Sequence, residues 1–187
     1  MRRLSFMMWI LTACGSSSVN SNDQAKQAYL GLDESIDKAI TLGFKGFNEA
    51  SSANIPTENT NGDVTGTMTI VGQVDQGASA NKGMRLQETL TTYSDSDAGI
   101  TYDTNTDAGP PELDMQLKGI PTGTLDGTLV GTYGMTGALK GEVALNVAFS
   151  GALEANDAGG VERKPGSTHI TGTATSGSGV YQIDLTR

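Results

Sequence analysis

The stretch LKGEVALNVAFSGALE, residues 139–154, decides the fold class of this chain. Apolar and polar side chains alternate along it, so that one parity is apolar and the other is polar. The apolar parity holds Leu139, Val143, Leu145, Val147, Phe149 and Leu153, and the polar parity holds Lys140, Glu142, Asn146, Ser150 and Glu154. Because successive side chains of a strand point to opposite faces, this period predicts a strand with one buried face and one solvent-exposed face.

The same alternation recurs upstream, in residues 64–75, 84–91, 112–118 and 124–133. Weaker runs lie at 100–106, 167–175 and 180–186, and segments rich in Gly, Asn, Asp and Ser separate the runs. The sequence therefore predicts a mainly β domain over residues 63–187. We expect an antiparallel meander of about eight strands, forming a coiled or closed barrel-like sheet, with a β-sandwich as the alternative.

A helical pattern precedes the strands. Ser21 with Gln24 fits a capping box, and apolar residues then recur at helical spacing as far as Phe47. We expect one amphipathic helix over residues 23–50, packed on the sheet. Residues 51–62 are polar and contain Pro56, so they are expected to form a linker.

The N-terminus has the pattern of an export signal. Arg2 and Arg3 precede an apolar run, residues 4–11, that is too short to span a bilayer, and Leu11-Thr12-Ala13-Cys14 follows. This stretch resembles the lipobox of bacterial lipoprotein precursors. The resemblance implies that residues 1–13 are a signal peptide cut off between Ala13 and Cys14. It also implies that Cys14 carries a diacylglyceryl group on its sulfur and an acyl chain on its amine. Residues 14–22, rich in Ser, Asn and Gly, are then a flexible spacer.

The charge of the chain limits its partners. Removing the two basic residues of the leader changes the formal charge from −9 to −11. Such an acidic domain is unsuited to nucleic acid, and it would attach to a membrane through the acyl chains on Cys14 rather than through its charge. Gly15 stands where enteric lipoproteins retained in the inner membrane carry Asp, so the resemblance favours the outer membrane. Cys14 is the only cysteine, and its lipidation leaves no thiol for a disulfide.

Glu88 is the candidate site residue with the clearest physical reason. It lies on the apolar parity of its strand, between Leu86 and Leu90. A buried carboxylate must be paired or shift its pKa, and such groups often mark sites. Glu88 could line a ligand cavity, pair with Arg85 or Lys82 after a bulge, or lie at an exposed sheet end. The methionines that could line the same cavity are Met68, Met84, Met115 and Met135.

Other chemistry has weaker support. His169, the only histidine, is most simply a solvated strand residue, and one histidine with one lipidated cysteine excludes a Cys/His zinc site. Residues 103–107 (DTNTD) begin like a calcium loop, to which Asp95 and Asp97 could add carboxylates. Ala108 and Asp114 occupy the places where an EF-hand requires Gly and Glu, so the pattern favours a solvated acidic loop. No cofactor is expected.

These observations predict a lipid-anchored protein of the bacterial envelope, a non-enzymatic module that binds an envelope partner or serves a structural role. One alternative is a lipocalin-like carrier of a small apolar ligand. A second alternative is an acid/base hydrolase of glycans that uses Glu88.

Overall fold

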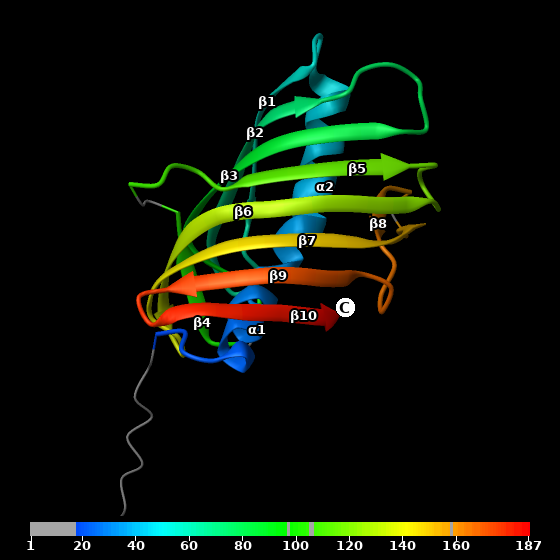
Figure 1. Cartoon of the computed structure of the whole chain (residues 1–187). Helices are drawn as coiled ribbons and strands as arrows, with labels where there is room; N and C mark the ends of the chain where they lie inside the picture. The colour runs from blue at the N-terminus through cyan, green and yellow to red at the C-terminus, as the bar shows by residue number, and fades with distance from the viewer. Residues whose placement is uncertain (1–17, 97, 105–106, 158) are drawn as a thin grey trace, which may run out of the picture.

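The computed structural model describes residues 18–96, 98–104, 107–157 and 159–187. As predicted, the protein is mainly β and antiparallel, with a helical segment at its N-terminal side (Figure 1). The helices are α1 (Asn22–Leu30) and α2 (Asp33–Glu49). The strands are β1 (Asn54–Asn61), β2 (Thr65–Val74), β3 (Lys82–Ser94), β4 (Ile100–Asp103), β5 (Glu112–Lys118), β6 (Thr124–Gly137), β7 (Gly141–Ala155), β8 (Val161–Arg163), β9 (His169–Ser176) and β10 (Gly179–Thr186).

The ten strands occupy eight positions of one meander. β4 and β5 both lie between β3 and β6, β4 at one end and β5 at the other. β8 and β9 in the same way both pair with β7. The eight positions follow one another in chain order, as the alternation predicts. Among the described residues β1 and β10 are not paired with each other, so the sheet is coiled but remains open.

Helix α2 crosses the strands on the concave side of the sheet (Figure 1). It contacts β1, β2, β3 and β8, while α1 packs against β10. Two glycines let α2 approach closely, because a Cβ at Gly43 or Gly46 would lie 2.9 Å from Met84 Sδ or Ile55 Cβ, respectively. The helices therefore fill the space that the coiled sheet encloses.

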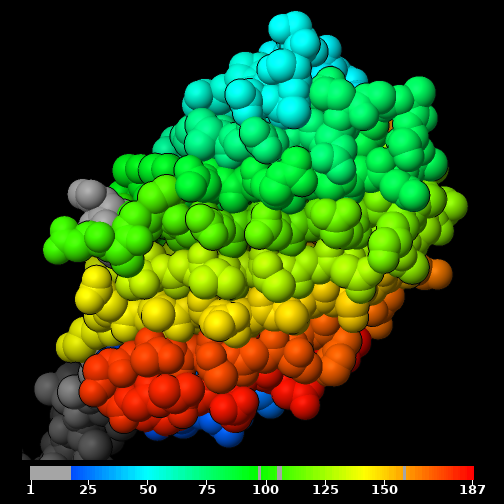
Figure 2. Space-filling view, turned by 45° about the horizontal axis from the view of Figure 1, so that its top comes forward, coloured from blue at the N-terminus to red at the C-terminus, as the bar shows by residue number. Residues whose placement is uncertain are grey.

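The core lies between the helices and the inner face of the sheet. It combines Ala28, Ile36 and Ile40 of the helices with inward side chains of every long strand, and all its members lie between Val19 and Ile183. The outer face is mostly polar, and Figure 2 shows the strands crossing it as successive bands in chain order. The described residues thus form a continuous core between the helices and the sheet.

The expected linker over residues 51–62 is wrong, because β1 occupies most of it. β1 pairs with β2, with Asn59 opposite Thr69, so the sheet begins at Asn54 rather than at residue 63. The register shifts between Ile55 and Glu58, where Pro56 lies, and prolines are tolerated at such irregularities of edge strands.

The expected spacer needs correction, and the expected helix over residues 23–50 is present but divided into α1 and α2. Residues 14–17 of the expected spacer lie outside the described residues, whereas Val19 is fully buried and α1 begins at Asn22. Ser21 does cap α1, since its hydroxyl accepts a hydrogen bond from the Gln24 amide at 3.3 Å. The helix then breaks after Leu30. A Cβ at Gly31 would lie 2.2 Å from the Tyr102 hydroxyl, so this tyrosine packs where only glycine fits.

Candidate functional site

Glu88 lies on the inner face of β3, opposite Ile70 of β2, and is fully buried. Its backbone amide donates to the Pro111 carbonyl at 3.0 Å, where the fourth strand position changes from β4 to β5. Neither carboxyl oxygen has a hydrogen-bond partner among the described residues. Burial raises the pKa of Glu88 to about 8, so the carboxyl is mainly neutral at pH 7.

The two cations expected as partners of Glu88 lie elsewhere. Arg85 points outward and pairs with Asp75 at 3.1 Å. The Lys82 ammonium donates to the Gly77 carbonyl and lies 4.3 Å from the centre of the Phe47 ring. The predictions that Glu88 pairs with Arg85 or Lys82, or lies at an exposed end of the sheet, are therefore wrong. Glu88 lies in the interior and has no hydrogen-bond partner among the described residues.

Two more buried polar atoms share this condition. The Tyr133 hydroxyl of β6 and the Ser35 hydroxyl of α2 are buried and have no partner among the described residues. Burial raises the pKa of Tyr133 well above its ordinary value, and the charge of Glu88 raises it further, so these two side chains lie within electrostatic range. Buried polar groups are normally paired, so an interior with three unpaired groups requires a physical explanation.

The remaining buried tyrosines are satisfied. Tyr29 donates to Asp33 at 2.8 Å, Tyr102 donates to the Ala28 carbonyl at 2.8 Å, and Tyr93 donates to Asp95. Tyr102 also meets the Tyr133 ring edge to face, with ring centres 6.3 Å apart. The fold thus provides partners for its other interior phenols and leaves Tyr133 without one.

The predicted cavity methionines are in the core. Met68 lies beside Leu90, next to Glu88 along the sheet, while Met84 and Met115 pair with each other further along β3 and β5. All three are fully or almost fully buried, and so is Met135 of β6. Met84 packs against α2 at Gly43, so the helix backbone covers this part of the interior.

A charged cluster fixes the first turn of α2 to the other end of the chain. The Arg163 guanidinium of β8 donates to both carboxyl oxygens of Asp33, at 2.9 and 3.0 Å, and to Asp37 at 2.7 Å. Arg187 donates to Asp33 at 3.0 Å. Burial alone would raise the pKa of Asp33, but the hydrogen bonds and charge of Arg163 outweigh it and lower the pKa. Beside this cluster lies an open cleft of about 360 Å³ whose charged groups are largely engaged with one another.

A second cluster holds the middle of α2. The Lys38 ammonium donates to Asp95 at 2.6 Å and to Asp63 at 2.8 Å, and it lies 5.6 Å from the centre of the Tyr93 ring. Burial would lower the pKa of Lys38, but these hydrogen bonds raise it. Near the C-terminal end of α2, Lys45 pairs with the buried Glu58 of β1 at 2.6 Å. Sequence reasoning identified none of these pairs, because residues far apart in the chain form them.

The other candidates are placed as follows. His169 is half exposed on β9 and its Nε2 lies 3.0 Å from Asp184 Oδ1. The calcium candidate falls partly on residues 97 and 105–106, which lie outside the described residues, as does the lipobox with Cys14. Within the described ranges, no three His, Cys, Asp or Glu side chains are grouped as a metal site, and no helix is long and apolar enough to cross a membrane.

Comparison with known proteins adds no relative. No protein-family model matches the chain, and neither the curated proteins nor the solved structures yield a match. The functional argument therefore depends on the residues themselves.

Proposed function

We propose that this protein is a lipid-anchored component of the bacterial cell envelope, whose β domain is a non-enzymatic module that binds a partner or serves a structural role at the membrane surface. The observation that carries the proposal is the lipobox-like stretch ending at Cys14, placed five residues before the buried Val19. Acyl chains on Cys14 would hold the domain firmly, since each buried methylene contributes about 0.8 kcal/mol.

The geometry of Glu88 agrees better with a non-enzymatic module than with a glycan hydrolase. A hydrolase of this kind needs two carboxyl groups that flank a substrate and reach water. Glu88 is fully buried, and within the described ranges no other carboxyl group is hydrogen-bonded to it. We therefore assign it no acid/base role.

The anchor is tested by Cys14→Ser, with Ser17→Ala as the matched control that leaves the lipobox intact. The control should incorporate labelled palmitate, lose residues 1–13 and remain with membranes after an alkaline wash. Cys14→Ser should incorporate no label and keep its leader. Normal trimming of Cys14→Ser together with firm membrane sedimentation would refute the anchor.

The destination is tested by Gly15→Asp. Following the resemblance to enteric lipoproteins, the unchanged chain should fractionate with the outer membrane and the variant with the inner membrane. An unchanged distribution between the two fractions would contradict the outer-membrane assignment.

A second candidate function is a carrier of a small apolar ligand that bears one hydrogen-bonding group. The specific observation in its favour is the set of unpaired interior groups on Glu88, Tyr133 and Ser35, surrounded by apolar side chains. Such groups gain more from a guest with a hydrogen-bonding head than from a purely apolar one.

Native mass spectrometry of the domain from Gly15 on, isolated from the producing cells, tests the carrier. A carrier should retain a small molecule that Glu88→Leu loses and that Glu112→Leu, altered on the outer face, keeps. A bare mass for the unchanged domain would refute the carrier and leave the anchored module as the function.

A further inference from the structure

The first described residues are fixed to one end of the sheet. The Ser176 hydroxyl donates to the Val19 carbonyl at 2.6 Å, and the hydroxyls of Ser18 and Ser178 lie 3.4 Å apart. The Gln182 amide donates to the Asn22 side chain at 2.9 Å. The chain therefore joins the folded domain at the β9–β10 hairpin.

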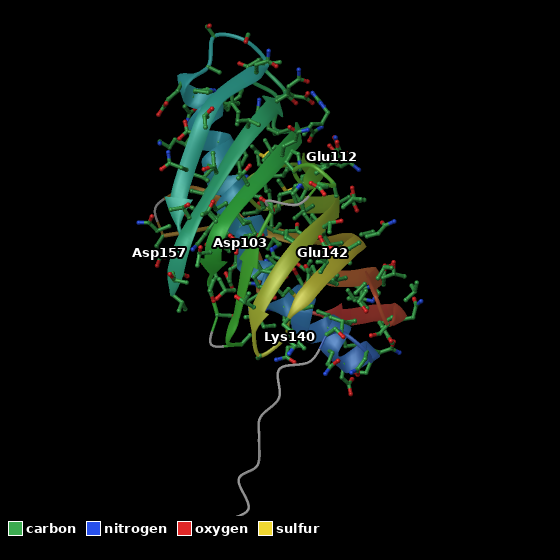
Figure 3. The ribbon with its side chains drawn as sticks, turned by 90° about the vertical axis from the view of Figure 1, so that its left-hand side faces the viewer. Asp103, Glu112, Lys140, Glu142 and Asp157 are labelled. Carbon is green, nitrogen blue, oxygen red and sulfur yellow. The ribbon has the colours of Figure 1, made fainter. Side chains whose placement is uncertain are left out.

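Besides the turn between β3 and β4, three turns lie at this end of the sheet, and we call these three the tether rim: residues 62–64, 138–140 and 177–178. In an antiparallel meander every second turn falls at the same end. Hydrogen bonds connect this end laterally, because the Val64 amide donates to Ser94 at 3.0 Å and the Ala138 amide donates to Gly99 at 2.8 Å. Lys140 of the rim is labelled in Figure 3, near the lower edge of the sheet.

Apolar side chains are exposed to solvent at the tether rim and directly beside it. Four large hydrophobic residues are exposed among the described ones, and the two most exposed, Val180 at 61% and Val64 at 59%, lie at this end. Lys140 adds a positive charge. Of the acidic residues at this end, Asp63 and Asp95 pair with Lys38, and Glu142 follows Lys140 by two positions in the chain.

The length of the tether limits how the domain can be oriented. Val19 lies five positions after Cys14, a separation that spans at most about 18 Å when the chain is fully extended. β7 runs away from the rim for 15 residues, or up to about 50 Å. The loops at its far end lie beyond the reach of the tether, whereas the β9–β10 turn of the rim lies where the tether joins the domain.

We infer that the tether rim is a membrane-contact surface, which rests on the bilayer with Val64 and Val180 in the headgroup region and directs the opposite loops toward the aqueous side. This inference depends on the proposed anchor at Cys14. Its partner is the lipid surface, because apolar side chains beside a lysine suit the boundary between acyl chains and headgroups.

Depth-dependent quenching tests the orientation. The full lipidated chain carries one added thiol, through Val64→Cys or Val180→Cys at the rim and through Ser79→Cys or Thr122→Cys at the far end. Each thiol receives a nitrobenzoxadiazole label, and the protein is placed in phosphatidylethanolamine/phosphatidylglycerol vesicles that contain brominated phosphatidylcholine. We expect loss of most of the fluorescence at the two rim positions and none at the far positions.

Flotation of the vesicles separates this inference from the anchor. If the protein does not float, the anchor at Cys14 is wrong and the rim contact fails with it. If the protein floats but all four labels keep their fluorescence, or only the far labels lose it, the anchor stands and the rim contact is overturned.

Discussion

Glu88→Gln is the substitution that tests the buried carboxyl most directly. In the unfolded chain this group ionises near its ordinary pKa of 4.5, and in the folded domain burial raises the pKa to about 8. Below pH 4.5 both states hold the proton, and the group leaves the free energy of unfolding unchanged. As the pH rises from 4.5 to 8, the unfolded state loses the proton first, so the folded state loses stability.

The size of this effect follows from the shift. Each unit of pKa corresponds to about 1.36 kcal/mol, so the wild type should lose roughly 5 kcal/mol between pH 4.5 and pH 8, and about 3 kcal/mol of it by pH 7. Glutamine has nearly the same shape but carries no charge. The stability of Glu88→Gln relative to the wild type should therefore increase by about 1.4 kcal/mol per pH unit over most of this range.

Urea unfolding of the domain from Gly15 on, followed by far-ultraviolet circular dichroism at half-unit steps from pH 5 to pH 8, measures the difference. Taking the difference between two variants cancels the groups that titrate in both. Glu112→Gln, which removes a carboxylate from the solvent side of β5, is the matched control and should run parallel to the wild type. Parallel curves for Glu88→Gln and the wild type would refute the reasoning, since Glu88 would then be charged or paired inside the fold.

Two further substitutions test the interior and its border by urea unfolding. Arg163→Ala leaves buried carboxylates without their cation and should lower the free energy of unfolding by about 3–5 kcal/mol. Arg85→Ala breaks an exposed pair and should lower it by at most about 1 kcal/mol. Equal losses would show that the charged cluster at α2 stabilises the fold no more than a surface pair does. Tyr102→Phe loses a buried hydrogen bond and should lower the free energy of unfolding by about 1 kcal/mol. Tyr133→Phe removes an unpaired hydroxyl and should leave the free energy of unfolding unchanged or slightly raised. A larger loss for Tyr133→Phe than for Tyr102→Phe would reveal a bound partner at the Tyr133 hydroxyl.

The strands were predictable because a half-buried sheet imposes its period on the sequence. In β7 the alternating burial of Val143, Leu145, Val147 and Phe149 is the same pattern that the residues show in the chain. The predicted number of about eight strands matches the eight positions only in total. The runs at 100–106 and 112–118 became β4 and β5 of a single position, and β1 adds a position that no alternating run predicted. The division of two positions into β4/β5 and β8/β9 was not predictable, because it depends on how each segment meets its neighbour.

β1 could not be recognised because its burial comes from partners rather than from its own pattern. It contains Pro56 and no alternation, and its two buried side chains are Ile55 and Glu58. A glutamate predicts a solvent-exposed position, and here Lys45 of α2 provides the charge that allows its burial. Only the folded arrangement of α2 over β1 brings these two residues together.

Part of the candidate site could be predicted from the sequence, and part of it could not. The position of Glu88 on an apolar parity correctly predicted an interior carboxyl, because parity alone determines the face. Tyr133 gave no signal, since a tyrosine on an apolar parity is also an ordinary core residue. The pairing of Asp33 with Arg163 joins residues 130 positions apart, and neither residue has a local pattern that identifies the other.

The open sheet and the polar interior have a common physical basis in α2. Because β1 and β10 do not hydrogen-bond to each other among the described residues, the coil of the sheet is held by the helix that crosses it. That helix is fixed by three charged contacts, through Asp33, Lys38 and Lys45, and by the close approach of Gly43 and Gly46. A closed barrel would hold its coil by hydrogen bonds between strands alone, whereas this open sheet is held by a helix that packs on β3, the strand of Glu88, and whose charged contacts lie at the border of the core. Any change that loosens those contacts would therefore also open the interior carboxyl to water, which couples the stability of α2 to the protonation of Glu88.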